Sequence, residues 1–127
     1  MAPAALVNLD IDDGQKVVQA LDKAGNNPSV ALWAKLPDYE NWRLILASNH
    51  FDQVSQSSGY SEIIDAMDKA GIPIYRQPTV LLRSMQSSMI DTLRNTFSSA
   101  ADTYGMRLGG QRFGDQYIEE AFVYRIH

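Results

Sequence analysis

The sequence predicts a single-domain α+β protein with a mainly antiparallel sheet, and three observations lead to this prediction. The chain has 127 residues, the usual size of one domain. Short apolar strand patterns alternate along it with amphipathic helix patterns. Two of the strand patterns are joined by a short polar loop, which is typical of a hairpin. The predicted element order over residues 1–127 is α-β-β-α-β-α-β-β, with about three helices on one face of the sheet.

The first half of the chain predicts a helix followed by a hairpin. A helix is expected over residues 13–24, with Asp12 as its N-cap and Gln15 completing a capping box. Strands are expected over residues 29–36 and 42–48. The polar residues 37–41 between them suit the loop of a β-hairpin.

The second half predicts two helices and three strands. Helices are expected over residues 60–69 and from residues 84–88 to Phe97, with a strand over residues 79–83 between them. The segment between Pro73 and Pro78 is expected to be a loop or a sheet edge, because proline cannot donate to a strand ladder.

The C-terminal part predicts a hairpin and a closing strand. Gly109 and Gly110 are expected in a turn, as are Gly114 and Asp115, and the closing strand is expected over residues 117–126.

The two helix patterns end in similar sequences. Val17–Gly25 and Ile63–Gly71 are identical at five of nine positions, and each is followed by a proline and a strand. Glycine just past a helix and proline beyond it are favoured at any helix end. The similarity is therefore interpreted as convergence of helix-ending signals, with duplication as the weaker alternative.

The hairpin register predicts what each face of the sheet carries. If Leu36 pairs with Trp42, then Ala34 lies opposite Leu44, on an apolar face that we assign to the helices. The same register leaves an apolar centre with a basic rim on the other face. The candidate ligand or interface residues on that face are Trp33, Lys35, Arg43, Ile45, Arg83, Val123 and Arg125.

Three interpretations of this candidate face remain open. A segment of the same chain could cover it, a second copy of the protein could pack on it, or an anionic small molecule could bind there. Self-association is favoured, because aromatic and arginine residues are enriched at interfaces and homodimers bury apolar centres.

Composition and charge exclude several classes of function. The chain has no cysteine and two histidines, which excludes thiol nucleophiles, disulfides, zinc ribbons and multi-histidine metal sites. A net charge of −4 argues against nucleic acid as a partner. No apolar run is long enough to cross a membrane and the first residues do not resemble a signal peptide, so a cytoplasmic protein is expected.

Three short motifs have simpler structural interpretations. The aspartates before Gly14 lack the spacing of a calcium loop and are expected to cap a helix. Gly109-Gly110-Gln111, the tripeptide of peptide-release factors, is interpreted as a turn. His50 and Asp52 could be a base and its orienting group, but a solvated histidine at a strand end is the expected role.

Three stretches resemble a group of small uncharacterised bacterial proteins of similar length. They are Ala31–Pro37, Trp42–Ala47 and Ile118–Ile126. The resemblance implies a bacterial protein of environmental or mobile gene-cassette origin. Its motifs are structural strands, so it carries over no activity and no catalytic residues.

The sequence thus predicts a non-enzymatic protein that forms a homodimer and binds a protein partner, with no cofactor, metal or catalytic residue assigned. The alternative is a small-molecule binding domain or small enzyme that uses the face around Trp33, with Arg43, Arg83 and Arg125 holding an anion.

Overall fold

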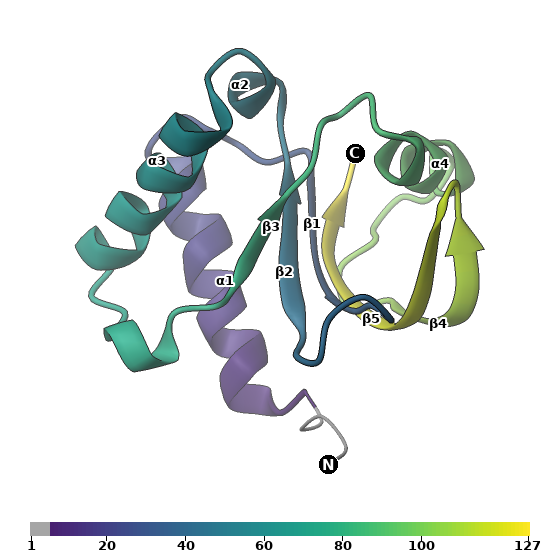
Figure 1. The fold of residues 1–127 in the computed structure, drawn as a ribbon, viewed down its shortest axis with the longest axis horizontal. Coiled ribbons are helices and arrows are strands. Elements are labelled where there is room, and N and C mark those ends of the chain that lie inside the picture. Colours follow the sequence, from purple (N-terminus) through teal and green to yellow (C-terminus); the bar gives the residue numbers. More distant parts are fainter. Residues whose placement is uncertain (1–5) are drawn as a thin grey trace.

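The computed structural model describes residues 6–127 and contains one five-stranded sheet with the strand order β3-β2-β1-β5-β4 (Figure 1). The neighbouring strands β2 and β3 are parallel and the other pairs are antiparallel. The elements in chain order are α1 (Asn8–Lys23), β1 (Val30–Lys35), β2 (Arg43–Ala47), α2 (Asn49–Asp52), α3 (Gln56–Lys69), the 3₁₀ turn η1 (Ile74–Arg76), β3 (Val80–Leu82), α4 (Ser88–Thr96), β4 (Arg107–Phe113) and β5 (Gln116–Ile126). The predicted α+β class, single domain and element order are confirmed.

Two helices begin earlier than predicted. The backbone N–H of Val7 donates to the carboxylate of Asp10 at 3.1 Å, so α1 begins at Asn8 and Asp12 lies inside the helix. The side chain of Ser55 accepts from the backbone N–H of Ser58, and α3 therefore begins at Gln56. In both helices the residue that caps the N-terminus lies about one turn before the predicted start.

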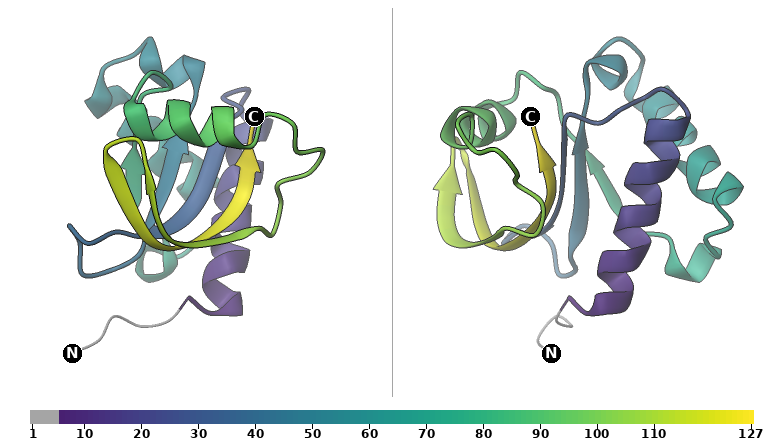
Figure 2. Two further views of the ribbon diagram at one scale, coloured as in Figure 1. Left: turned by 90° about the vertical axis from the view of Figure 1, so that its right-hand side faces the viewer. Right: turned by 180° about the vertical axis from the view of Figure 1, so that it is seen from behind.

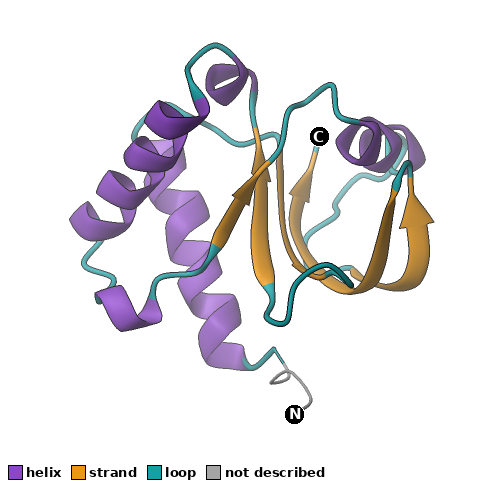
Figure 3. Ribbon diagram, in the orientation of Figure 1, coloured by secondary structure: helices purple, strands orange, loops and turns teal. Residues whose placement is uncertain are grey.

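Two turns also differ from the prediction (Figure 3). No helix was predicted between the strand at residues 42–48 and the helix at residues 60–69, but Ser48 accepts from the backbone N–H of Phe51 and caps the short helix α2. Gly109 and Gly110 lie within strand β4 rather than in a turn. The turn between β4 and β5 is formed by Gly114, with φ of 62°, and Asp115, as predicted.

The predicted register of the first hairpin is wrong by one residue. Leu32 lies opposite Ile45 and Trp33 lies opposite Leu44. Because side chains alternate between the faces of a strand, a shift of one residue moves every side chain of β2 to the other face relative to β1.

Both faces of the sheet are covered by helices (Figure 2). Helices α1 and α3 pack on the face that carries Ala31, Trp33 and Leu44. Helix α4 packs on the opposite face, against Leu32 and Ile45. The expectation of three helices on one face and an open second face is therefore wrong.

Strand β5 contains an irregularity that orients the side chains of Tyr124 and Arg125. Ala31 pairs with Arg125, but the next residue, Leu32, pairs with Val123, so Tyr124 is an extra residue in the strand. This bulge directs both Tyr124 and Arg125 toward α1. Within residues 6–127 no helix is long and apolar enough to span a membrane.

Candidate functional site

The apolar centre of the predicted site is divided between the two faces of the sheet. Trp33 is 6% exposed beneath α1, and its indole N–H donates to the backbone carbonyl of Asp10 at 3.1 Å. Ile45 and Val123 are fully buried in the other core, beneath α4. These three side chains do not form one surface.

Lys35 is already engaged at the base of the first hairpin. Its ammonium group donates to the carbonyls of Leu36 and Tyr39, at 3.2 and 2.8 Å, and lies 3.5 Å from the carboxylate of Glu119. The guanidinium of Arg43 lies 4.5 Å from the centre of the Tyr39 ring. Both cations therefore stabilise the loop that joins β1 to β2.

Arg125 is held by α1. Its guanidinium donates to both carboxylate oxygens of Asp22, at 2.9 and 2.8 Å, and to the carbonyl of Pro28. The hydrogen bond with Asp22 raises the pKa of Arg125 above its ordinary value. Arg125 thus joins β5 to α1. The anion-binding alternative requires Arg43, Arg83 and Arg125 to surround one ligand, and these three side chains do not converge.

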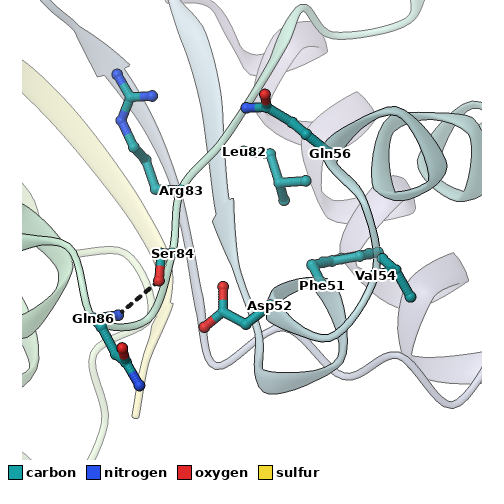
Figure 4. Close-up of a pocket in the computed structure, with 8 residues that line it drawn as sticks. All are labelled: Phe51, Asp52, Val54, Gln56, Leu82, Arg83, Ser84 and Gln86. Carbon is teal, nitrogen blue, oxygen red and sulfur yellow. Dashed lines mark hydrogen bonds between the residues drawn. The ribbon is translucent and has the colours of Figure 1, made fainter.

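Arg83 lines a pocket of about 360 Å³ at the carboxyl ends of the parallel strands β2 and β3 (Figure 4). Its guanidinium and the carboxylate of Asp52 are directed to different parts of this pocket. Asp52 accepts from the backbone N–H of Met85 at 3.0 Å, and Ser84 accepts from that of Gln86. The polar groups here mainly hold the loop that leads to α4.

His50 does not pair with Asp52. Its Nε2 lies 3.0 and 3.1 Å from the two carboxylate oxygens of Glu62, which ties α2 to α3. His50 and Asp52 therefore do not form a pair of a base and its orienting group.

A groove of about 710 Å³ lies between α1 and α3, on their side away from the sheet. The two helices pack side by side and run in opposite directions (Figure 1). When the two copies of the sequence repeat are aligned, five lining residues in or beside the first copy fall opposite five lining residues in or beside the second copy. The corresponding pairs are Lys16 and Glu62, Gln19 and Asp65, Ala20 and Ala66, Lys23 and Lys69, and Ala24 and Ala70.

This groove therefore has approximate two-fold symmetry in the positions of its lining residues, although Lys16 and its counterpart Glu62 have opposite charges. Two antiparallel helices that present corresponding positions to one groove are related by a local axis between them. The sequence revealed the repeat, but only the packing of α1 on α3 shows that both copies line one surface.

A second hollow, of about 400 Å³, lies between the start of α1 and the turn η1. Its aromatic walls are Trp33, Trp42 and Tyr75. At its edge the carboxylate of Asp13, which is 4% exposed, accepts from Nε and Nη2 of Arg76 at 3.2 and 2.8 Å. Tyr75 lies in the segment expected to be a loop or edge, and no functional role is predicted for it from the sequence.

Among residues 6–127, three or more histidine, cysteine, aspartate or glutamate side chains are nowhere grouped in a way that could hold a metal ion. Comparison of the chain with protein-family models, with curated protein sequences and with solved structures finds no match.

Proposed function

We propose that this is a non-enzymatic protein that self-associates, and that two copies meet through the groove between α1 and α3. The observation that carries the proposal is a groove that combines a floor of alanines with charges of both signs. A two-fold dimer uses the same patch on both subunits, so the patch must complement itself.

The charges of the groove meet this requirement. Lys16, Lys23 and Lys69 lie along the same surface as Glu62 and Asp65. When the patch is turned by two-fold rotation onto a second copy, lysines of one subunit can face carboxylates of the other. A surface with one sign of charge would repel its own copy instead.

The floor of the groove allows close approach of a partner helix. Ala20 in α1 and Ala66 in α3, with Ala24 and Ala70 directly after these helices, leave only methyl groups between the charged rims. Helix axes can approach to about 8 Å where the contact residues are small.

The edges of the sheet offer a less suitable route to self-association. Strand β3 has three residues, and the N–H of Leu82 already donates to the hydroxyl of Tyr60 at 2.9 Å. The other edge strand, β4, carries the exposed Arg107 and Arg112, and such charges discourage strand pairing between copies. The helical groove is therefore the favoured interface.

The test is the molar mass in solution by light scattering and sedimentation at micromolar concentration. We expect a dimer that becomes a monomer in Ala20→Arg, because the long side chain fills the groove. Asn95→Arg on α4 is the matched control and is expected to remain dimeric. A wild-type protein that is monomeric at every concentration contradicts self-association, and a dimer that tolerates Ala20→Arg contradicts this interface.

Charge complementarity has a sharper test. One variant has an acidic groove, with Lys16, Lys23 and Lys69 changed to Glu, and another has a basic groove, with Glu62 and Asp65 changed to Lys. Each variant alone is expected to be a monomer, and an equimolar mixture is expected to form a heterodimer. A mixture that stays monomeric would show that these charges do not face each other.

A further inference from the structure

The hollow between α1 and η1 combines aromatic walls with a negative local charge. The sequence contains two tryptophans, and both line this hollow. They come from separate segments, since Trp33 lies in β1 and Trp42 directly precedes β2. Tyr75 completes the walls from η1, and this side chain is 87% exposed although it is large and partly apolar.

The charged groups of the hollow leave a negative balance. Asp13 and Arg76 neutralise each other through two hydrogen bonds. Asp10 also lines the hollow, and one of its oxygens accepts from the backbone N–H of Val7. Its negative charge has no positively charged partner among residues 6–127. The carboxylate of Asp10, in the first turn of α1, therefore favours a cation over a phosphate or carboxylate ligand as the occupant of the hollow.

The walls favour a cation that is weakly hydrated. Leu6, Leu9 and Pro78 contribute apolar surface beside the aromatic rings. A bare ammonium group would lose its hydrating water on binding and would find few hydrogen-bond acceptors on this surface, so its desolvation would cost much free energy. A methylated ammonium group has little water to lose, and it gains from the electron-rich faces of tryptophan and tyrosine rings.

We propose that this hollow binds a ligand with a quaternary ammonium head of the choline type. The trimethylammonium head would contact the exposed ring of Tyr75, in the hollow that Trp33 and Trp42 also line. The carboxylate of Asp10 would supply the compensating charge. A volume of about 400 Å³ is at the small end of the range for ligand pockets, and it suits a compact head group.

The experiment is a titration of intrinsic tryptophan fluorescence, which reports on this hollow because both tryptophans line it. The probes are choline and 3,3-dimethylbutan-1-ol, which has the same shape without the charge. We expect a saturable change with choline and binding about tenfold or more weaker with the neutral alcohol. Equal binding of the two probes would show an apolar cavity only, and no saturation by choline up to millimolar concentration would also overturn the proposal.

Two variants and a control assign the binding to the named residues. Tyr75→Ala and Asp10→Asn are each expected to weaken choline binding about tenfold, and the asparagine oxygen can still accept from the N–H of Val7. Tyr104→Ala, which removes an exposed tyrosine outside the hollow, is expected to bind choline like the wild type. Circular dichroism checks that each variant folds. Wild-type affinity in both Tyr75→Ala and Asp10→Asn would overturn the assignment.

This site is independent of the proposed dimer. The groove variant Ala20→Arg should bind choline with wild-type affinity, because Ala20 does not line the hollow. Failure of self-association and failure of choline binding are therefore separate outcomes.

Discussion

The two faces of the sheet hold their helices by different means. On one face, α1 is fixed by hydrogen bonds to its backbone, since the indole of Trp33 donates to Asp10 and the hydroxyl of Tyr124 donates to Ile11. On the other face, α4 rests on an apolar core, and Arg94 of this helix donates near the surface to the carbonyl of His127, directly after β5. Directional bonds fix one position of a helix, whereas apolar packing tolerates small shifts.

The largest expected effect comes from a methyl group added beneath α1. In Gly14→Ala the new Cβ would lie 2.2 Å from the Tyr124 hydroxyl and 2.7 Å from the indole nitrogen of Trp33. Both hydrogen bonds to the helix backbone would be displaced. We expect the free energy of unfolding to fall by about 4 kcal/mol, measured by urea denaturation.

The same substitution in α3 is the matched control. In Gly59→Ala the closest atom to the new Cβ is a methyl carbon of Leu82 at 2.8 Å, at the flexible end of a side chain. The better helix propensity of alanine, about 1 kcal/mol, offsets the small displacement. A net change within about 1 kcal/mol is expected. Equal losses in the two variants would mean that the polar contacts of α1 are not what makes Gly14 sensitive.

The core beneath α4 is tested by Leu93→Ala in that helix. Leu93 is fully buried, and its truncation is expected to cost about 3 kcal/mol. Trp33 lies in the core beneath α1 and α3 and the half-buried Trp42 packs against that core, so the tryptophan emission of the folded variant should be unchanged. Leu21→Ala, at a fully buried position of α1, should lose similar stability and should shift the emission. An equal shift in both variants would show that the two cores are not independent.

The element order could be predicted from the sequence because it depends on local signals. Apolar periodicity and the glycines that end helices act within a few residues, and they placed the three long helices and most strands to within about one turn, whereas α2 and β4 were not placed. The hairpin register depends on the conformation of the loop, in which the N–H of Tyr39 donates to the carbonyl of Leu36. A difference of one residue there placed Trp33 on the same face as Ile45, and the predicted open face followed from that error.

The candidate sites were less predictable because they depend on long-range packing. The extra residue Tyr124 in β5 has no local signature, yet it places Arg125 beside Asp22, on the opposite face of the sheet from Val123. The repeat was visible in the sequence, but nothing local indicated that its two copies would line one groove. The hollow between α1 and η1 joins Trp33 to Tyr75 across segments whose contact only the fold creates.

The smallest expected effect depends on pH and distinguishes the two faces through Tyr124. Burial raises the pKa of this tyrosine above its ordinary value of 10.0. Below pH 10 the phenol is neutral in both the folded and the unfolded chain, and the full stability is present. Above pH 10 the unfolded chain releases this proton while the folded chain retains it, so stability falls as pH rises.

Tyr124→Phe is therefore expected to have two effects in urea denaturation between pH 7 and 11. It should lower stability at neutral pH by about 1 kcal/mol, through loss of the bond to Ile11. It should also reduce the alkaline decline, to which one such group contributes at most about 1.4 kcal/mol per pH unit. Leu93→Ala should instead lower stability by a similar amount at every pH and keep the wild-type slope. If the decline of stability with pH were unchanged in Tyr124→Phe, the site beneath α1 would not hold this phenol in its neutral form. Other groups would then cause the loss of stability at alkaline pH.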